Sequence, residues 1–332
     1  MTEPDVKTVV FSHAVHESAM RRIGEKVNVV VLNSSDTDSC IEALTQAEGF
    51  VMRIGRIGRD IMDRCPKLAV IARFGVGVDT VDVQAATGRG IPVTIASGAN
   101  VRSVAEHTVA LMYAIAKNLV EYHVENRKGD YFIRDKQASV ELCGRRAGIV
   151  GFGVIGRETA RIMKNNDLEV SVYDPFVKKE TVEEMGYTFE GNLQDLLGSV
   201  DVLSLHLPLM EETRGFLGKA EFDAMKEGML LVNCARGGII AEDALYDAMK
   251  DGKVAAAGVD VMCEEPTNPH SKLFELPNFI ATPHIAALSR EAFIKVSDMV
   301  VDGVLSILSG QRWPHVFNPD AYRHPRWNRH AG

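Results

Sequence analysis

The sequence predicts an α/β protein built from two doubly wound parallel sheets, and three observations lead to this expectation. Short apolar runs typical of buried strands alternate with helical patterns, and such alternation produces parallel sheets with right-handed crossovers. A glycine-rich turn at residues 151–156 opens a second series of these units. The length of 332 residues suffices for two domains, each with its own core.

The first series of units extends to residue 100. Its expected strands are residues 8–11, 27–32, 49–53, 68–72 and 92–95. The loop after the fourth strand, residues 74–79, contains two glycines and lies at the carboxyl end of a strand, where open α/β sheets bind ligands. Its N–H groups are predicted to hold a carboxylate; the alternative is a plain connection.

Two helical patterns mark the domain boundaries. One runs from Asn100 to Lys117 and leads into the second series, and the other begins at Ser289 and is expected to return to the first domain. We therefore predict a first domain of residues 1–101 and 294–332, with a second domain of residues 102–293 inserted into it. Residues 120–145 are polar and irregular, and we expect an excursion that embraces another subunit.

The turn that opens the second series reads Gly-Phe-Gly-Val-Ile-Gly after an apolar strand at residues 147–150. Gly151 permits a tight turn, Gly153 lets the backbone approach a pyrophosphate, and Gly156 allows close packing of helix on strand. The phosphates would then lie against the free N–H groups at the start of the helix. An ordinary turn is the alternative, because this motif alone is weak.

A second signal for a dinucleotide is Asp174, which directly follows the next expected strand, residues 168–173. An acidic residue at this place accepts the ribose hydroxyls. Its charge would repel a 2′-phosphate, so NAD is favoured over NADP. Asp174 could instead form a turn before Pro175.

Further strands are expected at residues 200–205, 229–233, 255–261 and 279–281. The segments after the last three contain Arg236, Glu265 and His284. A histidine that titrates near neutrality can exchange the proton that accompanies hydride transfer, and a carboxylate bonded to it fixes its tautomer. An arginine holds a substrate carboxylate and polarises the carbonyl. Singly, each residue could be structural, but three such residues at successive strand ends favour catalysis.

These motifs resemble the D-isomer-specific 2-hydroxyacid dehydrogenase family from Val51 to Ile307. The resemblance is carried by Cys-Ala-Arg-Gly-Gly-Ile at 234–239, by Asp260-Val261 with Glu265-Pro266, and by Pro283-His284. Within the family it is most similar to the catalytic region of the 3-phosphoglycerate dehydrogenases. The resemblance implies a Rossmann NAD domain, which forms a homodimer, inserted into a flavodoxin-like substrate domain.

The resemblance also implies residue roles. Arg236, Glu265 and His284 would be catalytic, with His284 the acid/base. The NAD site would comprise Gly151, Gly153, Val154, Ile155, Gly156, Asp174, His206, Leu207, Pro208, Cys234, Ala235, Asp260 and Ala286. Here Val154 and Ile155 would lie against the pyrophosphate and Asp260 would bond the nicotinamide amide. Val76 and Gly77 would offer N–H groups to the substrate carboxylate.

The substrate is expected to be a small 2-hydroxy acid with a second anionic group. Arg53, Arg73 and Arg102 lie beside the expected ligand loops, and one or two of them would bind that group; exposed arginines without a ligand are the alternative. The candidates are 3-phosphoglycerate, sulfolactate or a dicarboxylic hydroxy acid. Ile54 replaces the serine of the phosphoglycerate-type pattern, which argues against phosphate as the second group. Glu265 argues against formate chemistry, which pairs the histidine with glutamine.

Two other functions stay open: a glyoxylate/hydroxypyruvate reductase, or a non-catalytic NAD-binding regulator of the corepressor type. The net charge of −8 argues against nucleic acid or anionic lipid as a partner. Five scattered cysteines show no metal-ligand spacing, so no metal is expected and the chain is predicted to be cytoplasmic. Neither a signal peptide, a membrane span nor the regulatory domain of longer relatives is expected.

Overall fold

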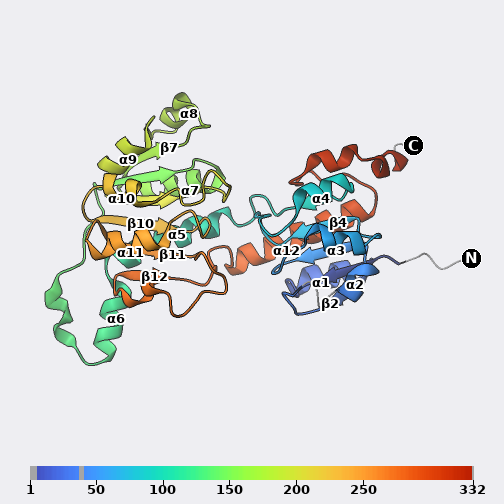
Figure 1. Ribbon diagram of the computed structural model, residues 1–332, viewed down its shortest axis with the longest axis horizontal. Coiled ribbons are helices and arrows are strands. Elements are labelled where there is room, and N and C mark those ends of the chain that lie inside the picture. The colour runs from blue at the N-terminus through green and yellow to red at the C-terminus, as the bar shows by residue number, and fades with distance from the viewer. Residues whose placement is uncertain (1–5, 37–40, 331–332) are drawn as a thin grey trace, which may run out of the picture. The chain divides into compact units, whose positions relative to one another are not determined.

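The computed structural model describes residues 6–36 and 41–330, and these form two compact units (Figure 1). Unit 1 comprises residues 1–100 and 288–332, and unit 2 comprises residues 101–287. The second boundary lies six residues before the expected one, because the helix that begins at Arg290 packs on unit 1 from its first turn. There Phe293 contacts Phe74, with ring centroids 5.2 Å apart.

Unit 1 contains a five-stranded parallel sheet in the order β2-β1-β3-β4-β5, the flavodoxin-like order. Its inner strands are buried on both faces, which explains their continuous apolar sequences. The strands are β1 (Thr8–Phe11), β2 (Asn28–Val31), β3 (Gly49–Met52), β4 (Val70–Arg73) and β5 (Val93–Thr94).

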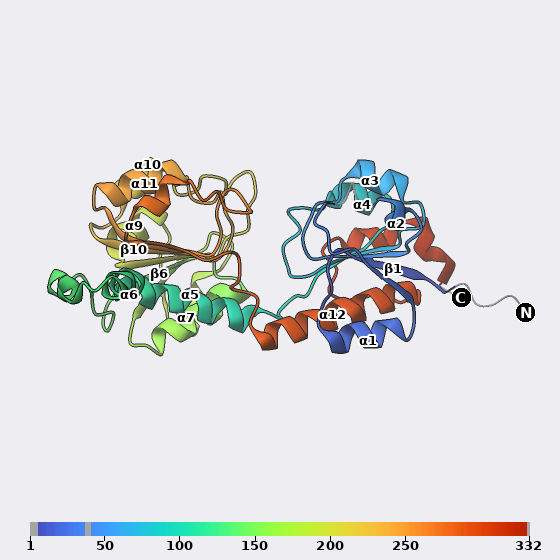
Figure 2. The same ribbon diagram turned by 90° about the horizontal axis from the view of Figure 1, so that it is seen from below.

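Helices cover both faces of this sheet, as Figure 2 shows. On one face α1 (Glu17–Gly24) and α12 (Arg290–Leu308) share a core with β1 and β4. The Ser289 side chain caps α12 by accepting from Ala292 N at 3.1 Å. The opposite face carries α2 (Ile41–Thr45), α3 (Arg59–Arg64) and α4 (Val83–Gly88). The sheet is therefore doubly wound, with α1 and α3 on opposite faces.

The C-terminal segment completes unit 1 at the free edge of β5. Val316 pairs with Thr94 in an antiparallel bridge, and Phe317 N donates to Val93 O at 2.8 Å. The buried Asn318 side chain accepts from Val93 N at 2.7 Å. Two 3-10 helices follow, η3 (Pro319–Arg323) and η4 (Pro325–His330). An edge that could pair with other chains is thereby covered.

Unit 2 contains a seven-stranded parallel sheet in the order β12-β11-β10-β9-β6-β7-β8. The chain enters at β6 and fills first one side of that strand and then the other, which is the Rossmann order with one further strand. The strands are β6 (Arg146–Val150), β7 (Glu169–Tyr173), β8 (Thr188–Phe189), β9 (Val202–Leu205), β10 (Met229–Asn233), β11 (Val254–Val259) and β12 (Phe279–Ala281).

Two helix layers enclose this second sheet (Figure 2). On one face α5 (Val101–Ala116) and α7 (Val154–Lys164) bury Met112, Ala160 and Met163. On the other face lie α9 (Leu193–Ser199), α10 (Lys219–Ala224) and α11 (Glu242–Lys250). The short α8 (Lys179–Glu184) adds Val182 to the first of these cores, and the 3-10 helix η2 (Lys272–Glu275) adds Leu273 to the second. The fold class expected from the sequence, two doubly wound parallel-sheet units, is thus confirmed.

One segment differs from its expected form. Residues 120–145 were expected to be irregular, yet they contain α6 (Leu119–Arg127) and the 3-10 helix η1 (Tyr131–Lys136). Neither helix buries a single residue, so the apolar stripe by which a sequence normally reveals a helix is missing. Cys40, one of the five cysteines of the sequence, lies outside the described residues. No helix in the described ranges is long and apolar enough to cross a membrane.

Candidate functional site

The glycine turn of unit 2 joins β6 to α7 and leaves the start of that helix open. Gly151 has φ +92°, and a Cβ there would lie 2.7 Å from His206 O in the loop after β9. A Cβ on Gly156 would lie 2.1 Å from Gly151 O, whereas one on Gly153 would meet nothing within 4 Å. Gly151 and Gly156 are therefore required by the fold, while Gly153 faces open space.

The first N–H groups of α7 have no partner within the helix, and Gly153 supplies no side-chain cap. Val154 is 67% exposed at this end. The turn lies between β6 and β9, where the chain changes direction across the sheet, so it occupies the crevice in which such sheets bind ligands. These features suit the pyrophosphate of a dinucleotide.

Asp174 follows β7 beside the same turn. Its Oδ2 accepts from Phe152 N at 2.7 Å and its Oδ1 from Phe176 N at 2.8 Å. Each carboxylate oxygen keeps a second lone pair, so the half-buried carboxylate can still accept from ribose hydroxyls. The two backbone hydrogen bonds fix the orientation of this carboxylate.

The loop after β9 contains three residues of the expected NAD site, His206, Leu207 and Pro208. Of these, Pro208 is exposed. His206 Nε2 lies 2.9 Å from Ser204 Oγ, and burial lowers the pKa of His206 to about 4. The imidazole is therefore neutral at physiological pH. Cys234, after β10, is buried as well, and this raises the pKa of its thiol to about 12. Both side chains lie at the carboxyl ends of neighbouring strands without carrying charge.

Arg236 lies in the loop after β10, and Asn233 shapes that loop. The Asn233 side chain donates to Arg236 O at 2.9 Å and accepts from Ala235 N at 3.0 Å. Arg236 Nη1 donates to Ala235 O at 2.7 Å. The buried Asn233, which sequence reasoning did not select, thus fixes the backbone that carries Arg236. The sequence feature that could have identified Asn233 is its position at the end of a strand, two residues before Ala235.

His284 and Glu265 form a hydrogen-bonded pair at the neighbouring strand ends. His284 Nδ1 lies 2.9 Å from Glu265 Oε2, and the two side chains are 47% and 42% exposed. A carboxylate can only accept, so Nδ1 carries the proton and Nε2 is left as the exchangeable site. His284 has φ +53°, and its N–H donates to Asp260 O at 2.9 Å.

Asp260 is the buried anchor of the His284 loop. Its carboxylate is 1% exposed; Oδ1 accepts from Thr282 Oγ1 at 2.6 Å and Ile285 N at 2.9 Å, and Oδ2 from Ala286 N at 2.8 Å. His107 Nε2 lies 3.0 Å from Thr282 Oγ1, which extends the network to α5. The structure thus places Asp260 and Ala286 together, and most of the accepting capacity of the carboxylate is used to hold the His284 loop.

Because β10, β11 and β12 are adjacent and parallel, their carboxyl ends bring the loops of Arg236, Asp260 and His284 to one edge of the sheet. The glycine turn and the His206 loop lie along the same edge. Unit 2 therefore places a histidine, its carboxylate partner and an arginine along the same sheet edge as the glycine turn. No group of three metal-ligating side chains occurs within the described ranges.

In unit 1 the loop after β4 has the glycine conformation that an exposed backbone site requires. Gly75 has φ +133°, and Arg73 stabilises the loop by donating to Gly77 O and Met52 O, each at 2.8 Å. Among the described residues, the N–H groups of Val76 and Gly77 donate to no protein acceptor. They are available for a carboxylate. The guanidinium of Arg73, in contrast, is engaged with the backbone.

The two remaining arginines differ in their surroundings. Arg102 Nη1 donates to Glu158 Oε1 at 2.9 Å and its Nε donates to Glu106, so two carboxylates compensate its charge. Arg53 stacks its guanidinium on Phe74 and Phe293, with ring centroids at 5.7 Å and 5.3 Å. Within the part of the chain that the structure describes, Arg53 forms no ion pair. Arg53 is thus the better placed for an anion.

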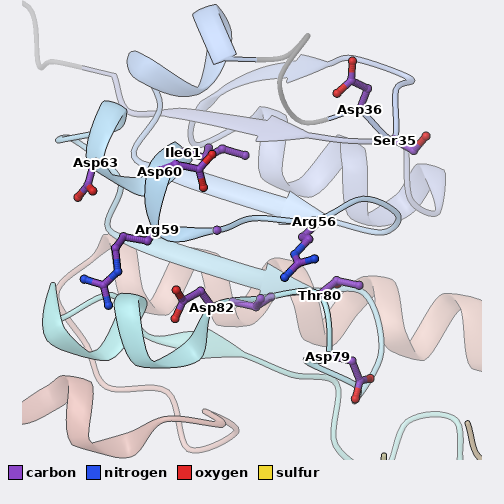
Figure 3. Close-up of a pocket in the computed structure, with 12 residues that line it drawn as sticks. Ser35, Asp36, Arg56, Arg59, Asp60, Ile61, Asp63, Asp79, Thr80 and Asp82 are labelled. Carbon is purple, nitrogen blue, oxygen red and sulfur yellow. The ribbon is translucent and has the colours of Figure 1, made fainter. Parts of the chain in front are cut away.

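A separate cavity of about 830 Å³ lies in unit 1 near α3 (Figure 3). Figure 3 shows Arg56 and Arg59 among side chains from α3 and the 79–82 loop. Five aspartates outnumber these two arginines, so the cavity does not suit an anionic acid; they are Asp36, Asp60, Asp63, Asp79 and Asp82.

The fold and these loops define a class: a two-unit α/β protein with a Rossmann dinucleotide site and an adjoining histidine–carboxylate pair. A family model described as the D-isomer specific 2-hydroxyacid dehydrogenase, NAD binding domain, matches residues 109–286. The chain belongs to this family, and NAD is its cofactor class.

Individual relatives agree with this membership. The chain is 39% identical over 306 residues to the D-3-phosphoglycerate dehydrogenase of Archaeoglobus fulgidus, and the match covers 91% of this chain but 57% of that relative. It is 34% identical to the glyoxylate reductase of Aeropyrum pernix, with 82% and 83% covered. The solved D-lactate dehydrogenase of Aquifex aeolicus, complexed with NAD and lactic acid, superposes with a TM-score of 0.85 at 26% identity, covering 94% of this chain and 99% of that one.

Proposed function

We propose that this protein is an NAD-dependent dehydrogenase that reversibly oxidises a small 2-hydroxy acid to the 2-keto acid. The observation that carries the proposal is the hydrogen bond between His284 Nδ1 and Glu265 Oε2, at the sheet edge that also holds Arg236 and the glycine turn. An exposed histidine oriented by a carboxylate suits the exchange of the proton that accompanies hydride transfer, and measured turnover distinguishes the enzyme from a regulator.

The open start of α7 would hold the pyrophosphate, and Asp174 would accept from the adenosine ribose. When bound, NAD supplies the acceptor for the hydride that leaves C2 of the hydroxy acid. His284 Nε2 takes the hydroxyl proton as this C–H bond breaks, and Glu265 stabilises the imidazolium that forms. Arg236 binds the substrate carboxylate and holds the C2 oxygen in reach of His284. In the reverse direction His284 returns the proton to the ketone.

For the substrate we propose an acid with a second anionic group, such as 3-phosphoglycerate or sulfolactate. Arg53 supports this, because a stacked guanidinium without an ion pair is a ready anion site. Val76 and Gly77 would hold the carboxylate through their N–H groups. The alternative is a glyoxylate/hydroxypyruvate reductase, a substrate class to which the 34% identical glyoxylate reductase points.

We also propose a homodimer formed through unit 2. The α6–η1 segment exposes five apolar side chains while burying none, and such a surface suits a second copy of the chain. These side chains are Leu119, Val120, Val124, Tyr131 and Phe132. The D-3-phosphoglycerate dehydrogenase of Archaeoglobus fulgidus is longer: this chain spans 57% of its length, so the assembly of that relative is no guide to this one.

The test is NADH production by the wild-type protein and the His284→Asn variant over a panel of D- and L-2-hydroxy acids. The wild type is expected to turn over one acid, and the variant to lose about 100-fold or more in kcat. NADH affinity, measured by fluorescence, should remain within about twofold because His284 does not hold the nucleotide. A wild type that binds NADH tightly yet turns over no acid in either direction would contradict the proposal and favour a regulator.

A further inference from the structure

The strand order of the sheet in unit 1 reverses direction between β1 and β3. The chain leaves β1 toward α1 on one face and leaves β3 toward α3 on the other, and β1 and β3 are neighbours. In open α/β sheets a ligand binds outside the carboxyl ends of the two strands at such a reversal. The side chains at this place are Ser12 and His13 after β1 and Arg53 after β3.

Ser12 links the end of β1 to the end of β3. Its Oγ is buried and accepts from Arg53 N at 2.9 Å, and it lies 3.3 Å from His13 Nδ1. After accepting from Arg53 N, the Ser12 hydroxyl still has its own proton and can donate it to His13 Nδ1. With that bond the ring proton lies on Nε2, where His13 can donate to a ligand.

The charge around His13 suits an anion. Burial, and after it the neighbouring Arg53, lower the pKa of His13, so the ring is neutral at physiological pH. Arg53 provides the positive charge, and its faces are covered by Phe74 and Phe293. Its in-plane N–H groups remain for an oxyanion, and the stacking limits the conformational entropy lost on binding. The two strand ends therefore offer one cation and one neutral donor.

We propose that His13 and Arg53 together bind the second anionic group of the substrate, so that His13 determines specificity for dianionic acids. This inference rests on the proposed function, and it adds a residue outside the catalytic loops of unit 2. The shared chemistry of the ligand is an oxyanion: a phosphate, a sulfonate or a second carboxylate. Its partners are the Arg53 guanidinium and His13 Nε2–H.

The experiment compares His13→Ala and His13→Gln with a matched histidine control, His16→Asn. His16 caps α1, accepting from Ser18 N at 3.4 Å, and asparagine keeps that capping capacity. Two quantities are measured for 3-phosphoglycerate, sulfolactate, malate and the monoanionic lactate. One is KM with NAD, and the other is the calorimetric Kd of each acid in the presence of NADH.

His13→Ala is expected to raise Kd and KM about tenfold for the preferred dianionic acid, equivalent to about 1.4 kcal/mol, and less than about twofold for lactate. The glutamine variant, whose amide can donate, should recover much of the loss, and His16→Asn should match the wild type. The dianion most affected identifies the oxyanion.

An equal loss for lactate and the dianions, or no loss at all, would overturn the role of His13. So would a wild type that binds none of the three dianionic acids. The calorimetric measurement needs no turnover. A wild type that binds a dianion through His13 but oxidises none would therefore support this inference while contradicting the proposed function.

Discussion

Replacing Asp260 by asparagine would test whether the His284 loop depends on one buried carboxylate. In the structure both carboxylate oxygens accept, from Thr282 Oγ1, Ile285 N and Ala286 N. An asparagine side chain has one accepting oxygen, and its NH₂ group would face at least one of these backbone N–H donors. The substitution keeps the volume, so its effects come from the altered hydrogen bonds and the lost charge and not from packing.

The magnitude follows from what the variant loses. A buried N–H left without an acceptor costs about 1–3 kcal/mol, and the remaining bonds lose their charge assistance. We expect a total of roughly 2–3 kcal/mol, which for a unit of this size lowers Tm by about 4–12 °C. The backbone of His284, held at φ +53° by the Asp260 loop, would lose its fixed position. Turnover should therefore fall about tenfold or more.

The assay is differential scanning calorimetry, with kcat measured on the acid identified for the wild type. The control is Asp223→Asn, which removes an exposed carboxylate paired with Lys219 at 3.0 Å and should shift Tm by less than about 1 °C. A D260N protein with the Tm and kcat of the wild type would refute the anchoring role.

Two further predictions concern unit 2. Gly153→Ala should keep the Tm of the wild type and lose NADH affinity, since the added Cβ meets no protein atom. Gly156→Ala should lower Tm, because its Cβ would lie 2.1 Å from Gly151 O. Thermal unfolding and NADH fluorescence measure the two quantities, and equal Tm values with equal NADH affinities for the two variants would contradict this. Hydrogen bonding from Arg161 and then Arg102 lowers the pKa of Glu158 from 4.5 to about 2. The unfolded chain thus binds this proton first, and the stabilisation is present above pH 4.5 and lost as the pH falls through 2. Glu158→Gln should lower the free energy of unfolding by roughly 1 kcal/mol at pH 7, but not near pH 2, in urea titrations; a pH-independent difference would exclude the ion pairs as its source.

The sequence was informative where chemistry depends on local order. Period and composition identified the strands, and strand ends in parallel sheets share one edge, so Arg236, Glu265 and His284 could be placed together in advance. The roles assigned to these residues and to the cofactor wall stay predictions until the experiments above are done. The helix α6 escaped detection because it buries no side chain and has no apolar stripe.

The sequence by itself determined the two doubly wound sheets, the glycine turn and the family, because each depends on residues that are neighbours along the chain. Only the tertiary structure decided which arginine has a positive charge that no carboxylate of the protein compensates. Arg102 meets Glu158, a residue 56 positions away, whereas Arg53 meets Phe74 and Phe293. It also brought His13 beside Arg53 through Ser12. The free energy of a charged side chain is set by the partners that folding brings to it, and no local pattern specifies those partners.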